Sequence, residues 1–251
     1  MVMGVPKIIH QIWFDFSKDG SGRDPPKKYS TSKEYCERIN CDWVFKLWNE
    51  RDCLELVKTE YPEYLEMYQN YKYPIQKVDA AKYFILHAYG GVYMDMDMQC
   101  RKPLNIKGDG VFLVEVNTIS KYNNAFIASS PREPFWQVVF QLLKKAQEES
   151  SIKNLNLNWL TIFNTTGPYI LDSAAKQMPV NSLPVDLYEA CDWCGNVSNK
   201  DYYVIHHSDN NWTTSFEKVV VKLWCLKSYI IILLSFIIIL IIIGVLYIKL
   251  K

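Results

Sequence analysis

The sequence predicts an α/β fold, formed by one catalytic-type domain over residues 1–222 and followed by a C-terminal membrane anchor over residues 223–251. Two patterns lead to this prediction. In the first part of the chain, helical segments alternate with short apolar strands, as expected for a sheet with helices packed against it. Near the end, an uninterrupted apolar run covers about residues 229–248, which is long enough to cross a bilayer as one helix.

The elements of the domain follow from local patterns. Residues 5–13 are largely apolar and predict a first strand that suits a buried parallel sheet. Residues 16–29 contain Gly, Ser, Lys and two prolines, and predict a polar loop at the carboxyl end of that strand, where ligand crevices of open α/β sheets lie. Further helices are expected over residues 31–38, 51–60, 64–69, 77–89 and 134–149. Further strands are expected near residues 43–47, 91–95 and 111–115.

Two aspartates, Asp95 and Asp97, follow a short apolar strand that is entered through a glycine pair. At positions i and i+2 they point to the same face, and where the strand ends they can share one divalent cation. Oxygen ligands of this kind suit Mg²⁺ or Mn²⁺. An Asp-x-Asp triplet is weak evidence by itself, because a solvated turn also produces it. An EF-hand calcium loop beginning at Asp95 is excluded, since its required Gly and Glu positions hold Cys100 and Ile106.

The segment before the strand, residues 77–89, predicts a helix that ends at Gly90, a residue typical of helix C-caps. Its apolar stripe consists of Val78, Ala81, Ile85 and Ala88. Asp79 and Lys82 lie three residues apart and therefore share one face of this helix. The unit is a helix, a glycine turn, a strand and an acidic pair.

Residues 77–103, together with residues 6–13, resemble the DXD-containing sugar transferases of glycosyltransferase family 32, which include initiating mannosyltransferases and inositol-phosphoceramide mannosyltransferases. Further matches follow in order: Lys46-Leu47-Trp48-Asn49, Tyr61-Pro62, Tyr73-Pro74, Asn124-Ala125-Phe126, Pro134-Phe135-Trp136, Thr166-Gly167-Pro168, and Ile205-His206-His207 with Trp212. The resemblance covers about residues 5–215. It implies a single Rossmann-like nucleotide-sugar-binding domain of the GT-A type.

The resemblance also implies roles for particular residues. Asp95 and Asp97 are expected to hold Mn²⁺ or Mg²⁺ against the donor diphosphate, and His206 is expected to complete the metal shell. Asp79 and Lys82 join the two aspartates in the expected catalytic set, because they position the donor sugar. The residues expected to contact the donor are His10, Gln11, Trp13, Asp79, Lys82, Tyr93, Asp95, Asn124 and Trp212. Retention of the anomeric configuration is implied, and no side chain can be assigned as a covalent nucleophile.

Several of these residues have an ordinary structural alternative. Lys82 stands where the family usually has Arg, and it lacks the planar fork that binds two oxygens at once. It could be an exposed helix residue paired with Asp79. Gln11 could be a satisfied core amide, and His206 could be structural, as paired histidines often are.

We therefore expect a metal-dependent glycosyltransferase that moves a hexose from GDP-mannose or a UDP-hexose to a glycan or lipid head-group acceptor, with mannose favoured over galactose and glucose. The chain has 28 basic and 27 acidic residues, a balance that does not favour nucleic acid as a partner. Two other classes stay open. A metal-dependent phosphohydrolase would need more clustered His and Asp ligands. A membrane-tethered sugar-nucleotide-binding or glycan-binding protein without turnover is motivated by Lys82.

The location of the domain is open as well. The N-terminus shows no signal-peptide pattern, so a single-pass C-terminal anchor leaves the domain facing the cytosol by default. The Golgi or ER lumen is the alternative, because many relatives in the resembled family work in the Golgi lumen. Lysines flank both ends of the apolar run and give no orientation. The seven cysteines are expected to be packing residues or, in a lumen, to form a local bridge.

Overall fold

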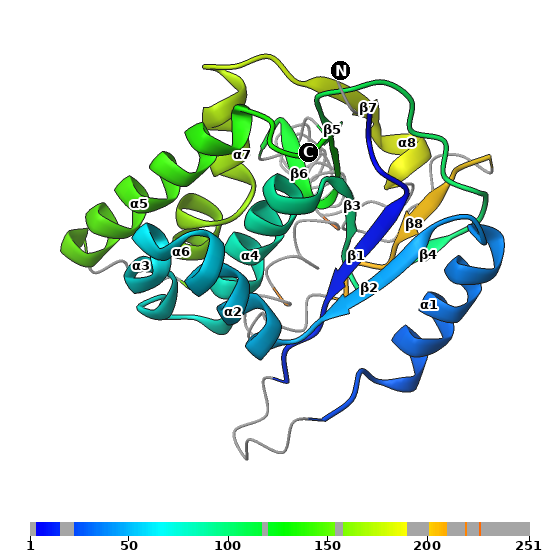
Figure 1. The fold of residues 1–251 in the computed structure, drawn as a ribbon, viewed down its shortest axis with the longest axis horizontal. Coiled ribbons are helices and arrows are strands. Elements are labelled where there is room, and N and C mark those ends of the chain that lie inside the picture. The colour runs from blue at the N-terminus through cyan, green and yellow to red at the C-terminus, as the bar shows by residue number, and fades with distance from the viewer. Residues whose placement is uncertain are drawn as a thin grey trace, which may run out of the picture.

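The computed structural model describes residues 4–15, 23–116, 120–153, 158–189, 201–209, 219 and 226, and it has the expected α/β class (Figure 1). A six-stranded sheet has the strand order β2-β1-β3-β6-β5-β7. Its strands are β1 (Ile8–Ile12), β2 (Val44–Trp48), β3 (Gly91–Met94), β5 (Val111–Glu115), β6 (Tyr122–Ser129) and β7 (Asn181–Pro184). A second sheet pairs β4 (Met98–Cys100) with β8 (Val204–His206).

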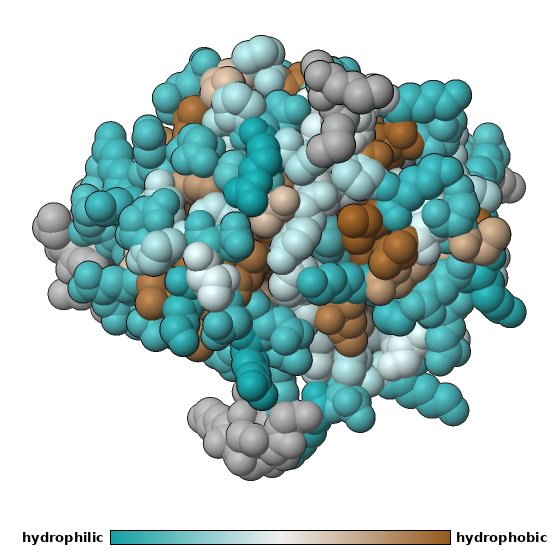
Figure 2. Space-filling view, in the orientation of Figure 1, coloured by the Kyte–Doolittle hydropathy of each residue, from teal (hydrophilic) through white to brown (hydrophobic). Residues whose placement is uncertain are grey.

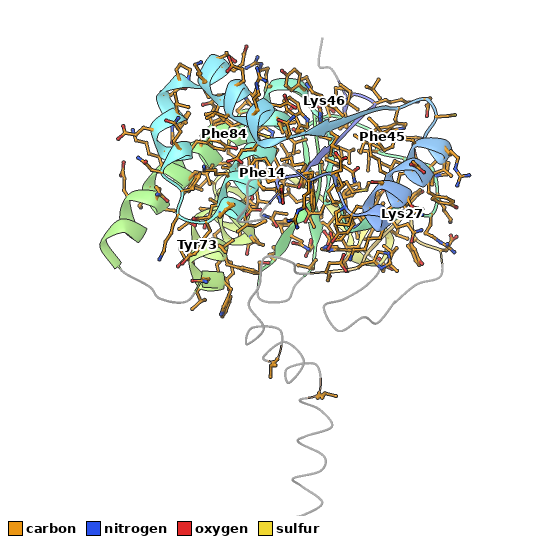
Figure 3. The ribbon with its side chains drawn as sticks, turned by 90° about the horizontal axis from the view of Figure 1, so that it is seen from below. Phe14, Lys27, Phe45, Lys46, Tyr73 and Phe84 are labelled. Atoms are coloured by element: carbon orange, nitrogen blue, oxygen red, sulfur yellow. A yellow bond between two sulfur atoms is a disulfide. The ribbon has the colours of Figure 1, made fainter. Side chains whose placement is uncertain are left out.

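Helices cover both faces of the large sheet (Figure 1). One face carries α2 (Glu50–Glu60), η1 (Pro62–Tyr64), α3 (Leu65–Gln69), α4 (Pro74–Tyr89), α5 (Phe135–Lys153), α6 (Asn158–Thr165) and α7 (Pro168–Ala175). The other face carries α1 (Lys27–Ile39), α8 (Val185–Tyr188) and the small sheet. Seen from below, Phe84 lies among the first group of helices and Phe45 lies beside α1 (Figure 3). Two hydrophobic cores, one on each face, therefore stabilise the sheet.

The sheet is mixed. Strand β1 pairs in parallel with β2 and β3, as its apolar sequence predicted, but β6 runs antiparallel to both β3 and β5. The expected helices and strands are all present where the chain is described, although α1 begins at Lys27, inside the predicted polar loop. Strands β4, β6, β7 and β8 were not predicted, because they are short or carry polar residues. The parallel strands β1 and β3 bring their carboxyl ends to the same edge, and this edge holds the site.

The glycine pair between α4 and β3 fixes the position of the following aspartates. Gly90 is the C-cap of α4 with φ 64°, and Gly91 has φ 93°. A Cβ atom on Gly91 would lie 2.5 Å from the carbonyl oxygen of Ile8 on the neighbouring strand. Only glycine allows this backbone conformation and this close approach together. The pair thus lets α4 turn directly into β3 beside β1.

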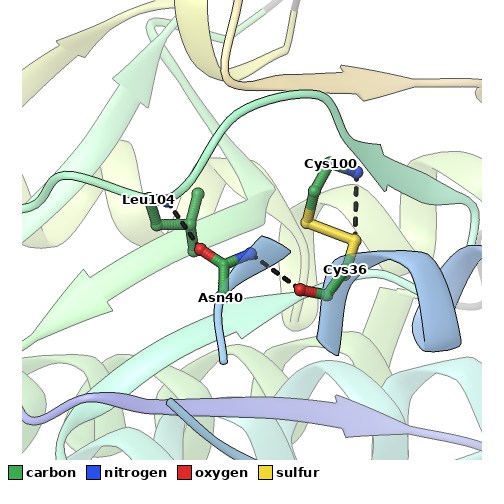
Figure 4. The surroundings of a disulfide bond; sticks show 4 residues. All are labelled: Cys36, Asn40, Cys100 and Leu104. Carbon is green, nitrogen blue, oxygen red and sulfur yellow. Dashed lines mark hydrogen bonds between the residues drawn. A yellow bond between two sulfur atoms is a disulfide. The ribbon is translucent and has the colours of Figure 1, made fainter. Parts of the chain in front are cut away.

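A disulfide bond joins Cys36 of α1 to Cys100 of β4 (Figure 4). Beside it, the Asn40 side chain donates to the carbonyl of Cys36 and accepts from the backbone N–H of Leu104. The bond connects positions 64 residues apart, so it is a long-range tie and not a local bridge. It fixes α1 to the strand that begins directly after Asp97.

The surface shown in Figure 2 has hydrophobic residues scattered among hydrophilic ones. The large exposed hydrophobic residues include Val44 and Leu47, both on the edge strand β2. Within the described ranges, no helix combines the length and apolar character needed to cross a bilayer. The predicted span over residues 229–248 lies outside these ranges, so the anchor stays a prediction. Of the seven cysteines, Cys191 and Cys194 also lie outside these ranges.

Candidate functional site

A cavity lies at the carboxyl ends of β1 and β3. Its apolar walls come from the end of β1, from α4 and from the α6–α7 turn, with Ile12, Val78 and Phe163 among them. Its polar lining residues include Tyr29, Asp79, Lys82, Tyr93, Asp95, Asp97, Asn123, Asn124, His206, Ser208 and Asp209. A concave site with apolar walls and a few convergent polar groups is typical of small-molecule binding.

The two aspartates of the DXD motif occupy the turn between β3 and β4. The backbone N–H of Asp95 donates to the carbonyl of Ala125 on β6, at 2.9 Å, which holds the turn against the sheet. The hydroxyl of Tyr93 donates to Oδ1 of Asp95 at 2.6 Å. The first aspartate is thereby oriented by the strand that precedes it.

His206 lies beside this turn because β8 pairs antiparallel with β4. In that register His206 is opposite Met98, the residue that follows Asp97. Its Nε2 atom lies 3.3 Å from Oδ1 of Asp97. Ligand atoms of Asp95, Asp97 and His206 all lie within 4.8 Å of one another. Two carboxylates and one imidazole form a donor set that fits Mn²⁺, and the carboxylates alone suit Mg²⁺.

The charges in this cluster influence one another. Burial lowers the pKa of His206, but hydrogen bonds to Asp97 and Glu189 outweigh it and leave that pKa well above its ordinary value. Burial raises the pKa of Asp97, yet the contact with His206 and the backbone N–H of Asp209 bring it below its ordinary value. The carboxylates of Asp97 and Glu189, which lie on either side of the ring, therefore favour the protonated form of His206.

A second polar group adjoins the first on α4. The ammonium of Lys82 lies 2.9 Å from Oδ1 of Asp79 and 3.6 Å from Oδ1 of Asp95. Asp79 also accepts hydrogen bonds from the side chains of Asn124 and Thr166. Lys82 is 2% exposed, so the alternative of an exposed helix residue is wrong. Burial lowers the pKa of Lys82, and the two carboxylates more than reverse this effect.

The segment after β8 closes one side of the cavity. The backbone N–H of His207 donates to the carbonyl of Asp97 at 3.0 Å, and that of Asp209 donates to Oδ2 of Asp97 at 2.8 Å. The carboxylate of Asp209 accepts from Tyr29 at 2.7 Å and from Lys28 at 2.5 Å, both on α1. This segment therefore connects the DXD turn with the first turn of α1.

Two residues expected to bind the donor do not line the cavity. His10 is buried and accepts a hydrogen bond from Nε1 of Trp48 at 3.1 Å, while its Nε2 lies 2.9 Å from the carbonyl oxygen of Gly90. Gln11 is buried too, and within the described part of the chain its Oε1 has no hydrogen-bond partner. The cavity lies beyond the end of β1, so only residues from Ile12 onward reach it.

Most of the other residues that were expected at the site line the cavity. The structure gathers most of them around the cavity: Trp13, Asp79, Lys82, Tyr93, Asp95, Asp97, Asn124 and His206. Trp212 lies outside the described residues. Sequence reasoning missed Tyr29, Asn123 and Glu189. Tyr29 ends the predicted polar loop at the ligand crevice and Asn123 directly precedes a matched motif, so both had a nearby signal, whereas no local pattern marks Glu189. Asp209 belongs to the matched segment that ends at Trp212, which was a signal that could have found it.

The domain has a mixed sheet covered by helices, two aspartates that follow β3, and the Asp79–Lys82 ion pair on the preceding helix α4. These features together define a domain of the glycosyltransferase type. The comparisons agree with this class. A family model described as glycosyltransferase sugar-binding region containing DXD motif matches residues 26–124. The UDP-bound glycosyltransferase domain from the YGT toxin superimposes with a TM-score of 0.54 over 72% of this chain and 80% of that chain. Its sequence identity is 9%, so it shows the fold alone.

Two fungal proteins are similar in sequence. The chain is 30% identical over 225 residues to inositol phosphoceramide mannosyltransferase 1 of Schizosaccharomyces pombe, over 86% of this chain and 64% of the relative. It is 33% identical over 174 residues to mannosyl phosphorylinositol ceramide synthase SUR1 of Saccharomyces cerevisiae, over 69% of this chain and 42% of the relative. The resemblance of the chain to the DXD-containing sugar transferases, predicted from its motifs, is therefore confirmed. It spans about two-fifths to just under two-thirds of the length of these relatives.

Proposed function

We propose that this protein is a metal-dependent glycosyltransferase that moves a hexose, with mannose favoured, from a nucleotide-diphosphate sugar to a glycan or lipid head-group acceptor. The observation that carries the proposal is the cluster of Asp95, Asp97 and His206 at the edge of a cavity that also contains Asp79 and Lys82. The two fungal relatives, a mannosyltransferase and a mannosyl phosphorylinositol ceramide synthase by name, support mannose and a lipid acceptor. Retention of configuration rests on the family resemblance.

The chain's own residues divide the work between binding and positioning. Asp95, Asp97 and His206 would hold Mn²⁺, or Mg²⁺, at the donor diphosphate. When bound, this ion supplies Lewis-acid neutralisation of the charge that develops on the leaving nucleoside diphosphate. Asp79 and Lys82, which are fixed to each other on α4, orient the donor sugar and place a positive charge beside the diphosphate. Residues 206–209 close over the DXD turn and limit the access of water.

We also propose that residues 223–251 anchor the domain of residues 1–222 in a membrane, which would keep the cavity near lipid acceptors. The disulfide between Cys36 and Cys100 supports the lumenal side over the cytosolic default. Disulfides form and persist in oxidising compartments and are rare in the cytosol. The Golgi or ER lumen is such a compartment.

The test is release of nucleotide from a panel of GDP-sugars and UDP-sugars by the full chain in detergent micelles with Mn²⁺. We expect release from one donor, loss of that release on adding EDTA, and a loss of at least about a hundredfold in Asp97→Asn, which keeps the shape of the side chain. Asp109→Asn, an exposed aspartate in a loop, is the matched control and should keep full release. Donor binding without release, even with lipid acceptors present, would contradict the enzyme and favour a binding protein without turnover.

A further inference from the structure

We infer that Glu189 is a positioning residue, which holds the imidazole of His206 with Nε2 directed at Asp97 and at the metal that Asp97 binds. This inference rests on the proposed metal-dependent function and adds a residue that neither the motifs nor the family resemblance marks. Glu189 acts through His206 and is not itself a ligand.

The imidazole of His206 lies between two carboxylates. Its Nε2 atom lies 3.3 Å from Oδ1 of Asp97, and its Nδ1 atom lies 3.5 Å from Oε2 of Glu189. The two acidic residues therefore face opposite nitrogens of the same ring. One of them belongs to the DXD motif, and the other follows helix α8 on the far side of the histidine.

The position of Glu189 is fixed by the fold. Its backbone N–H donates to the carbonyl of Val185, which closes the short helix α8. The backbone N–H of Tyr203, directly before β8, donates to the carbonyl of Leu187 at 2.7 Å and so joins α8 to the strand that carries His206. The side chain of Asn123, which lines the cavity, donates to Oε2 of Glu189. The backbone of Glu189 is thus fixed by α8, and its carboxylate is held by Asn123.

The burial of Glu189 calls for an explanation. The residue is 4% exposed, and within the described part of the chain its Oε1 atom has no hydrogen-bond partner. Burying a carboxylate is costly unless a positive or strongly polarised group compensates for it. Among the described residues, the partners of its side chain are Asn123 and His206. The carboxyl group of Glu189 is therefore directed at the imidazole.

The chemistry of histidine supplies the function. An imidazole that binds a metal through Nε2 must carry its proton on Nδ1, and a carboxylate that accepts from Nδ1–H fixes both this tautomer and the orientation of the ring. It also makes the ligating nitrogen more basic. Loss of such an outer carboxylate typically weakens metal binding by about tenfold to a hundredfold.

The test is Mn²⁺ binding to the full chain in detergent micelles, measured from the electron paramagnetic resonance signal of the free ion, with no nucleotide and no turnover. The variants are Glu189→Gln, His206→Ala and the two combined. Glutamine keeps the shape, but its amide can donate to Nδ1 and so allow the wrong tautomer. We expect Glu189→Gln to weaken Mn²⁺ binding by about tenfold to a hundredfold. We expect the double variant to bind no more weakly than His206→Ala, because Glu189 acts through the histidine. Asp186→Asn, on the same short helix, is the matched control.

Wild-type affinity in Glu189→Gln, or an equal further loss when it is added to His206→Ala, would overturn the inference. If Glu189→Gln does not fold, the same cycle is measured with Glu189→Asp, which keeps the charge and withdraws it by one methylene. That variant is expected to lose several-fold affinity only while His206 is present. Wild-type protein that binds no Mn²⁺ would contradict the proposed metal-dependent function, and would therefore contradict this inference as well.

Discussion

The ammonium of Lys82 lies 2.9 Å from Oδ1 of Asp79, and both side chains are almost completely buried. The same ammonium donates to the backbone carbonyl of Asn124 and lies over the ring of Tyr93, 4.6 Å from its centroid. It also lies 3.6 Å from Oδ1 of Asp95. The ammonium of Lys82 therefore connects α4 to the DXD motif. It lines the cavity and is also almost completely buried.

The pair predicts a large effect when one partner is removed. Lys82→Met leaves the carboxylate of Asp79 buried without its cation, which typically costs about 3–5 kcal/mol of unfolding free energy. Adding Asp79→Asn should recover part of this loss, because the unpaired charge disappears. The measurement is thermal unfolding of the full chain, followed by near-ultraviolet circular dichroism.

Lys77→Met is the matched control for this prediction. Lys77 lies on the same helix and pairs with Glu50 at 3.7 Å, but both side chains are partly exposed. Exposed pairs contribute at most about 1 kcal/mol. Equal losses in Lys77→Met and Lys82→Met, or a double variant that is less stable than Lys82→Met alone, would show that the buried pair is not what matters.

The arrangement of helix α4 and the DXD turn was predictable because it depends on neighbours in the sequence. The spacing of Asp79 and Lys82, the glycines and the strand after them lie within about twenty residues, and helix and strand periodicity determine which side chains share a face. The structure adds that this helix is buried on most sides, since further helices pack around it. The apolar stripe alone could not distinguish a helix with one buried face from a helix that is buried on most sides.

The remainder of the site depends on contacts between distant segments. His206 reaches the motif only because β8 pairs with β4, and β8 has three residues. Glu189 and the bond between Cys36 and Cys100 likewise depend on how α8 and α1 pack, which no local pattern encodes. His10 was expected in the donor pocket because the family resemblance places the end of the first strand there, but the cavity begins only at Ile12. Both ring nitrogens of His10 lie within hydrogen-bond distance of internal partners, the carbonyl of Gly90 and Nε1 of Trp48.

Gly91 should tolerate no side chain. A Cβ atom there would lie 2.5 Å from the carbonyl oxygen of Ile8, a backbone atom that cannot move without disturbing β1. We expect Gly91→Ala to lower the unfolding free energy by at least about 3 kcal/mol, from backbone strain and from the clash together. Gly108→Ala is the control, because Gly108 also has positive φ but its Cβ would meet only Phe112, at 3.5 Å. It should cost only the backbone strain, about 1–3 kcal/mol, without the clash. Comparable thermal shifts in both variants would show that the contact with Ile8 is unimportant.

The disulfide should stabilise the domain by restricting the unfolded chain. For a bond that spans 64 residues, we expect the double variant Cys36→Ser, Cys100→Ser to lose about 2–4 kcal/mol of unfolding free energy. Cys41→Ser changes an exposed free cysteine and should have little effect. In cells that produce the full chain, a maleimide reagent should label Cys36 and Cys100 only after denaturation and reduction. Labelling of both after denaturation alone would place the domain in a reducing compartment.

His10 should make stability depend on pH below neutrality. Burial lowers its pKa from 6.5 to about 4, and the nearby Lys46 acts in the same direction, while the hydrogen bond to the Gly90 carbonyl opposes it. Between pH 6.5 and 4 the unfolded chain binds a proton at this position and the folded chain does not. Stability is therefore fully present above pH 6.5 and falls as the pH decreases toward 4, by up to about 3 kcal/mol.

The measurement is the melting temperature across this range, compared with His10→Asn, which cannot titrate and should give a shallower dependence. His87, whose pKa burial also lowers to about 4, contributes to the slope that remains. An unchanged slope in His10→Asn would mean that His10 is accessible to solvent, and would return it to the candidates for donor binding.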